Sequence, residues 1–258
     1  KGEFCESANY AFGEGGAGTF SDGKLTSRTK NIDKEKNFVI ESYIEAGAPE
    51  EIRYLSHPHI GTNNLIKVVR NLRQKFEEIG GKILFETTLQ DIVINDRQVV
   101  AIETDKGKID CDYLFVACGH SAYDTYRLLL GKGVKFQNKA FAIGSRVEHL
   151  QEIINLSQWG KKKINGLKAA EYKLTHKATN ALPVYSFCMC PGGKIVQASP
   201  QKGLSIVNGM SYYSRSSPWA NSAIVAGIFL PELLNKEITP NEALDWLEQK
   251  EQVFYELN

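Results

Sequence analysis

Five glycines within eleven residues are the feature that most restricts how this chain can fold. They lie in GEGGAGTFSDGKL, residues 13–25, where Gly13, Gly15 and Gly18 match the letters G-x-G-x-x-G. After a buried strand and before a helix, that pattern holds the pyrophosphate of a dinucleotide at the helix N-terminus. Glycines also adopt positive φ and let another group approach the backbone closely. The context of the glycines therefore decides what they are for.

The surrounding sequence does not supply the context of a dinucleotide fingerprint. Residues 5–12 (CESANYAF) contain one adjacent apolar pair, and residues 19–31 have no apolar stripe of helical period. A flexible surface loop is one remaining interpretation. The other is a loop whose N–H groups, hydroxyls and Lys24 contact a phosphate or an electron-rich ring. The apolar residues Phe20 and Leu25, which would anchor such a loop, favour the second interpretation.

Composition excludes several classes of function. The chain has 258 residues, 42% of them hydrophobic and 24% charged, as is typical of one large or two modest globular domains. A net charge of +1 gives no long-range attraction to nucleic acid or to an anionic membrane. No apolar run approaches the ~20 residues that span a bilayer. Five irregularly spaced cysteines form no disulfide framework, so we expect a reducing, cytoplasmic setting.

Apolar periodicity and capping signals predict four helices. The strongest is residues 63–79, an amphipathic helix capped by Thr62 and ended by two glycines. Residues 33–46 form a second helix. The pattern S-x-x-D at Ser121 and Asp124 predicts a third, reaching about residue 130. A capping box at residues 239–242 begins the fourth, which we expect to run through the last residue, 258.

Alternating and continuous apolar segments predict two sets of strands. The first set comprises residues 82–86, a meander of 90–95, 98–104 and 108–111, and residues 113–118, whose apolar run indicates a strand buried on both faces. The second set comprises 140–148, 184–188, 194–197 and 204–210, and we expect the apolar stretch 222–230 to be buried. A lysine-rich stretch, 158–179, separates parts of the second set and reads as irregular.

Six long stretches resemble the FAD-dependent dehydrogenases of bacteria, which are related to the glutathione-reductase-like flavoproteins. They are FGEGGAGTFSDGKLTSR (12–28), HIGTNNLIKVVRNLRQKFEEIGGKI (59–83), CDYLFVACGHSAYDTYRLLLGKGV (111–134), KAFAIGSRVEH (139–149), SFCMCPGGKIVQAS (186–199) and NGMSYYSRSSPWANSAIV (208–225). The resemblance covers most of the chain, and the stretches occur in the order that the family has.

The resemblance implies a mixed α/β (α+β) flavoprotein with two domains. Residues 1–131 would be a partial FAD-binding, Rossmann-like domain with a β meander. Residues 132–258 would be an inserted β-rich substrate domain, truncated at its C-terminal end. In this family the true G-x-G-x-x-G lies nearer the N-terminus, and a second glycine-rich FAD segment lies near the C-terminus. We find neither in this chain and expect it to be an internal fragment.

The same resemblance assigns candidate cofactor residues. The glycine loop would run along the FAD pyrophosphate towards the isoalloxazine, and a strand end at Cys118 and Gly119 would pack near the cofactor. The family usually has threonine where Cys118 stands, so a hydroxyl contact there is in doubt. The candidate FAD-binding residues are Gly13, Gly15, Gly16, Gly18, Thr19, Ser21, Asp22, Gly23, Lys24, Cys118 and Gly119.

Catalytic residues are less well indicated. His57 and His59 lack further ligands at zinc spacing, so we expect no metal site, although His59 lies in a family motif and could face the active site. Arg146 could pair with Glu148 or hold a substrate carboxylate, with His149 as an acid or base. Other candidates are Arg215, within a polar group of a second motif, and the pair Cys188 and Cys190, which could be redox-active or simply buried.

These observations predict an FAD-dependent oxidoreductase that moves a hydride between an organic small molecule and flavin. The fragment alone would be inactive and would not retain FAD. Two alternatives stay open: a flavin- or ligand-binding scaffold without redox chemistry, and a thiol-redox protein that uses Cys188 and Cys190. We expect no nucleic-acid or membrane partner. The substrate, the electron donor and the oligomeric state do not follow from the sequence.

Overall fold

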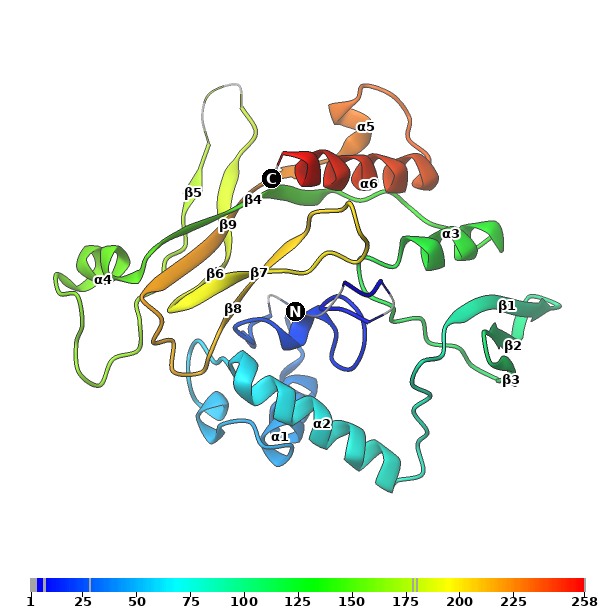
Figure 1. The fold of residues 1–258 in the computed structure, drawn as a ribbon, viewed down its shortest axis with the longest axis horizontal. Coiled ribbons are helices and arrows are strands. Elements are labelled where there is room, and N and C mark those ends of the chain that lie inside the picture. Colours follow the sequence, from blue (N-terminus) through cyan, green and yellow to red (C-terminus); the bar gives the residue numbers. More distant parts are fainter. Residues whose placement is uncertain (1–3, 7, 28, 178, 180, 258) are drawn as a thin grey trace.

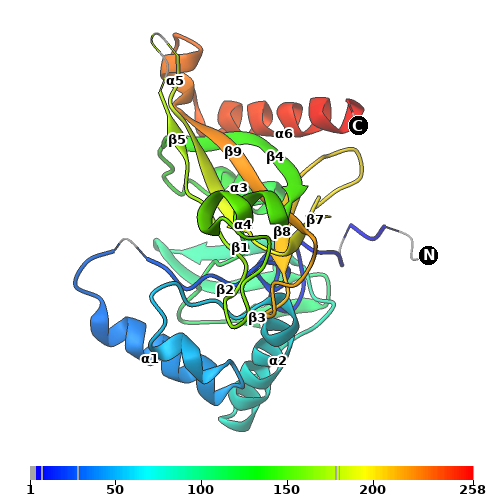
Figure 2. The same cartoon turned by 90° about the vertical axis from the view of Figure 1, so that its left-hand side faces the viewer.

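The computed structural model describes residues 4–6, 8–27, 29–177, 179 and 181–257. It is a mixed α/β structure with three separate antiparallel sheets (Figure 1). Helices α1 and α2 lie at one end of the molecule and α6 lies at the other, with the N-terminal segment between them (Figure 1, Figure 2). The described residues contain no parallel sheet, so the Rossmann-like part of the prediction is not confirmed.

The largest sheet belongs to the second half of the chain and has the order β4-β9-β6-β5. Its strands are β4 (Phe141–Leu150), β9 (Trp219–Ile228), β6 (Val184–Cys190) and β5 (Thr175–His176). A separate hairpin joins β7 (Gly193–Gln197) to β8 (Val207–Ser211). The predicted strands of this half are confirmed, and β9 is rich in buried side chains as its apolar sequence indicated.

The helical end consists of α1 (Asp33–Glu45), a 3₁₀ turn η2 (Glu50–Arg53) and α2 (Thr62–Glu78), packed on one apolar cluster. Ile40, Ile52, Ile60 and Val68 form the centre of that cluster. Both helices were predicted, but the proposed cap of α2 is wrong. Gly61 holds the cap position, whereas the Thr62 hydroxyl donates to the carbonyl of Thr19 at 2.7 Å.

The predicted meander is the second sheet: β1 (Leu89–Asn95), β2 (Gln98–Thr104) and β3 (Gly107–Asp110). Helix α3 (Tyr123–Gly131) follows it. The capping pattern predicted for α3 is wrong, because Ala122 is the cap residue and no side chain caps this helix. The Asp124 carboxylate accepts instead from the neighbouring Thr125 N–H at 2.8 Å.

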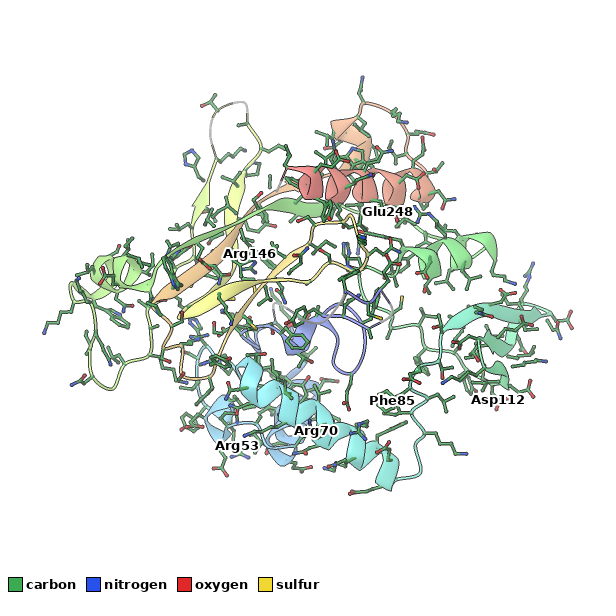
Figure 3. The ribbon with its side chains drawn as sticks, in the orientation of Figure 1. Arg53, Arg70, Phe85, Asp112, Arg146 and Glu248 are labelled. Atoms are coloured by element: carbon green, nitrogen blue, oxygen red, sulfur yellow. The ribbon has the colours of Figure 1, made fainter. Side chains whose placement is uncertain are left out.

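Two predicted strands are absent from the described structure. Residues 82–86 and 113–118 form connections that pair with no strand, and residues 85–86 form a turn (Figure 1). Their apolar side chains face solvent: Phe85 is exposed (labelled in Figure 3), and Phe115 is 92% exposed. Apolar composition alone does not make a strand, because the backbone must also find a hydrogen-bonded neighbour.

Three helices complete the second half of the chain. They are α4 (Gln151–Trp159), which the sequence interpretation missed, α5 (Leu230–Leu233) and α6 (Pro240–Glu256). The capping box of α6 is confirmed, with Thr239 and Glu242 bonded to each other's backbone N–H groups. The helix ends at Glu256, two residues before the predicted end, which lies outside the described residues. None of the described helices combines the length and apolarity needed to cross a membrane.

Candidate functional site

A cavity of about 800 Å³ lies where three parts of the chain meet. The glycine loop forms one wall, the connection from residue 117 to 121 forms another, and the β7–β8 hairpin closes the third side. The lining residues are Ala11, Phe12, Gly13, Gly15, Gly16, Ala17, Gly18, Ala117, Cys118, Gly119, His120, Ser121, Ala198, Ile206, Val207 and Asn208. The structure thus brings together the two predicted cofactor segments, which are about a hundred residues apart in sequence.

The glycine loop turns sharply at the mouth of the cavity. Gly13 and Gly15 have φ of 98° and 81°, and a short 3₁₀ turn, η1 (Ala17–Thr19), follows Gly16. A Cβ atom placed on Gly13 or Gly18 would meet no protein atom within 4 Å, so the loop leaves open space there. Among the described residues, the Gly15 N–H, which lies outside any helix or strand, has no backbone acceptor. This wall can therefore receive an anion close to its backbone.

Asn208 fixes the shape of the glycine loop. Its side-chain amide donates to the carbonyls of Ala17 at 3.2 Å and Phe20 at 2.8 Å. One side chain on β8 therefore holds both ends of the η1 turn and lines the same cavity. Ser21 supports the turn from inside, since its hydroxyl donates to Gly18 O at 2.7 Å and accepts from Gly23 N–H at 3.0 Å.

The opposite wall exposes the backbone at Gly119, next to the lining residues His120 and Ser121. Gly119 has φ of 80°, and a Cβ atom there would also meet open space. The hydroxyl of Tyr126, on α3, donates to Gly119 O at 2.6 Å and holds this turn. The Cys118 sulfur lies 3.9 Å from the same carbonyl oxygen. A close approach of a ligand to the backbone at Gly119 is therefore sterically open.

The second half of the glycine loop does not line the cavity. Asp22 is 1% exposed and binds Arg215, itself 6% exposed, through Nε at 3.0 Å and Nη2 at 2.5 Å. Lys24 adds a contact to Asp22 at 2.7 Å. Burial alone would raise the pKa of Asp22, but the hydrogen bonds and charges of Arg215 and Lys24 lower it. Thr19 is buried behind the loop. Cofactor contacts by these residues stay predictions.

His59 is buried beside this ion pair and not in an open cleft. Its ring stacks on Tyr213, with centroids 5.1 Å apart, and Nε2 lies 3.2 Å from the Tyr213 carbonyl. Burial, helped by the charge of Arg215, lowers the pKa of His59 to about 4, so the ring is neutral at pH 7. Because His59 is only 1% exposed, this packing leaves its ring without the access to solvent or substrate that a proton-transfer role would require.

The other candidates lie on the large sheet. Arg146 on β4 points to the neighbouring strands, where Nη1 donates to Asn221 Oδ1 at 2.5 Å and Cys188 O at 3.2 Å (Figure 3). No ion pair with Glu148 forms in the described structure. His149 Nε2 lies 2.9 Å from the hydroxyl of Tyr172.

Several site residues were missed by sequence reasoning. His120 and Ser121 line the cavity directly after Gly119, and their position after a predicted strand end was the available signal. Lys168 places its ammonium 4.0 Å from the ring centroid of Tyr213, from a stretch with no recognisable pattern. No cluster of three or more His, Cys, Asp or Glu side chains suited to a metal occurs in the part of the chain that the structure describes.

Comparison with known proteins gives an FAD-associated family for part of the chain. Residues 140–258 match the family model described as "FAD-dependent protein, C-terminal domain-like". A protein of Clostridium beijerinckii, described as an uncharacterized protein, is 45% identical over 223 residues, or 86% of this chain. The chain spans 42% of that relative's length. The matched family supports an association with FAD, and neither comparison names a substrate.

Proposed function

We propose that this chain is part of an FAD-dependent oxidoreductase and that the cavity beside the glycine loop receives part of the FAD. One observation carries the proposal: two segments a hundred residues apart, both suggested as FAD contacts by the sequence, face one cavity of about 800 Å³. The family matched by residues 140–258 supports the choice of cofactor. As a bound group, FAD would supply the hydride chemistry, and the protein would orient it.

The chemistry of the walls fits a dinucleotide. The unoccupied N–H of Gly15 and the open space beside Gly18 suit the pyrophosphate, and the open backbone at Gly119 permits close contact with a flat ring. The apolar lining at Ile206 and Val207 suits a heterocycle. Asn208 holds the conformation of the η1 turn through two hydrogen bonds from its neutral amide. The walls carry no carboxylate that would repel the pyrophosphate.

We further propose that the chain is an internal portion of a longer flavoprotein. The relative from Clostridium beijerinckii is more than twice as long as the matched segment. A cavity walled only by one glycine loop, one connection and one hairpin leaves much of a dinucleotide uncovered. On this proposal the isolated chain binds FAD weakly, and tight binding requires the segments that complete the FAD domain.

The test is the visible absorption spectrum of the protein expressed from its complete reading frame. We expect bound flavin near one equivalent, lost in Gly18→Val because the new side chain enters the open space beside Gly18. Gly227→Val is the matched control, since it also meets no atom within 4 Å but lies on β9 away from the cavity. Protein without flavin, or flavin retained in Gly18→Val, would contradict the proposal. Bound flavin that neither nicotinamides nor organic donors reduce would leave only a scaffold role.

A further inference from the structure

Strand β6 is interrupted at Cys188. Its pairing with β9 is regular up to Phe187, opposite Ala223, and resumes at Cys190, opposite Asn221, so one extra residue is inserted. Cys188 occupies the left-handed region with φ of 48°. Such a bulge redirects a side chain, and a non-glycine residue in this region has a conformational cost. The thiol of Cys188 therefore leaves the regular alternation of the strand.

Two cations hold the bulge. Arg146 Nη1 donates to the carbonyl of Cys188 at 3.2 Å, and the Lys24 ammonium donates to the carbonyl of Met189. The positive charges therefore come from two elements, β4 and the glycine loop, and converge on two adjacent residues. Asp22 is the acidic group nearby, and it is already paired with Arg215 as well as Lys24.

A second thiol lies within reach of the first. Cys190 is fully buried, and its Sγ lies 3.3 Å from the Cys188 carbonyl oxygen, whereas Cys188 is partly exposed. Asn221, opposite Cys190, is also fully buried, and its Nδ2 has no hydrogen-bond partner among the described residues. The bulge thus combines an accessible thiol, a buried thiol and an unused amide donor.

The surroundings favour the thiolate form of Cys188. A hydrogen bond from the Cys190 thiol, with the charges of Arg146 and Lys24, lowers the pKa of Cys188 despite its burial. The same interaction and burial raise the pKa of Cys190, which stays protonated. Thiolates beside cations are the reactive form of cysteine, and the buried neutral partner is poised to respond to oxidation of the first.

We propose that Cys188 is an oxidation site for hydroperoxides and that Cys190 resolves the product to an intramolecular disulfide. The Cys188 thiolate attacks one peroxide oxygen, so that an S–O bond forms, the O–O bond breaks, and the departing alkoxide or hydroxide takes a proton from water. The Cys190 thiol then displaces the sulfenic oxygen as water while the S–S bond forms. The sulfur pair loses two electrons, and the peroxide gains them.

This site lies outside the proposed flavin cavity. Neither Cys188 nor Cys190 lines that cavity, and the reaction needs only a hydroperoxide. The disulfide would tighten the bulge that Lys24 holds, so oxidation would act on the glycine loop through the Lys24 contact with Met189. Loss of flavin binding would not remove the oxidation site, and loss of the oxidation site would not disprove flavin binding.

Alkylation of the purified chain tests the first step. At about pH 6, iodoacetamide should label Cys188 roughly tenfold faster than Cys111, a partly exposed thiol outside the cluster. Lys24→Met should reduce this preference about threefold or more, because one of the two cations is removed. Peptide mass spectrometry measures both rates in one sample. Equal labelling of Cys188 and Cys111 would overturn the proposal.

Treatment with one equivalent of hydrogen peroxide tests the second step. The peptide that contains Cys188 and Cys190 should lose two hydrogens in wild type and recover them after reduction. In Cys190→Ser, dimedone should trap a sulfenic acid at Cys188, and in Cys188→Ser the remaining Cys190 should stay reduced. Far-ultraviolet circular dichroism confirms that each variant is folded. Oxidation that spares this peptide, or that persists in Cys188→Ser, would overturn the proposal.

Discussion

Asp22 and Arg215 are 193 positions apart in the chain and form a buried two-point ion pair. Asp22 lies in the second half of the glycine loop, and Arg215 lies in the connection between β8 and β9. Their contact fixes the N-terminal segment against the second half of the molecule. The cavity walls meet because this pair and the Asn208 amide hold their elements together.

Removing one partner of this pair should be strongly destabilising. Asp22→Ala leaves the Arg215 guanidinium buried without its principal counter-ion, which costs about 3–5 kcal/mol of unfolding free energy. Glu41→Ala is the matched control, because Glu41 pairs with Arg53 by the same two-point geometry at the surface. There we expect a much smaller loss, because solvent screens an exposed ion pair. Urea denaturation measures both variants, and similar losses would contradict the assigned role of burial.

A side chain at Gly192 should destabilise the protein through a steric clash as well as through its positive φ. Gly192 has φ of 51°, and a Cβ atom there would lie 1.9 Å from the carbonyl oxygen of Arg215. Gly203 has φ of 87° but open space around it. Gly192→Ala should therefore lose about 1–3 kcal/mol more stability than Gly203→Ala. Thermal unfolding of the two variants checks this, and equal losses would show that the Arg215 backbone simply moves away.

Much of the fold follows from local sequence patterns. The stripe of α2, the meander β1–β3 and the strands of the large sheet are local, since each depends on spacing within one segment. The strand predictions for residues 82–86 and 113–118 were wrong because a strand needs a hydrogen-bonded partner elsewhere in the chain. An apolar segment does not reveal whether such a partner is present. Helix α4 was missed between a predicted strand and the lysine-rich stretch that begins at residue 158. Its Gln151 and Asn155 side chains are buried by hydrogen bonds to each other and to Ala170.

The site was predictable in part. That the glycine loop and the Cys118–Gly119 connection lie close together could be predicted only from the family resemblance. No local sequence pattern in either segment indicates the contact. Polar spacing could not distinguish a cofactor contact from a structural ion pair, so Asp22 and Lys24 were grouped with the glycines that line the cavity. The bulge at Cys188 was also invisible, since regular strand alternation predicts both thiols on one face.

The two helix caps predicted from the sequence should contribute differently to the free energy of unfolding. Thr239 accepts from the Glu242 N–H at 3.3 Å, so Thr239→Ala should cost about 1 kcal/mol of unfolding free energy. Ser121 precedes α3 in a similar pattern but makes no capping bond, and Ser121→Ala should change stability by less than about 0.5 kcal/mol. Guanidinium denaturation measures both. An equal cost would mean that Ser121 caps α3 in solution.

His59 should make the stability of the protein depend on pH in a defined window. Burial lowers its pKa from 6.5 to about 4, so between these pH values the unfolded chain binds a proton that the folded ring rejects. The stabilisation is therefore fully present above pH 6.5 and is lost as pH decreases through the window, by on the order of 3 kcal/mol. His59→Gln should flatten this dependence, measured by urea denaturation across the window. His176→Gln, at an exposed ring, is the control, and a slope unchanged by His59→Gln would show that other groups cause it.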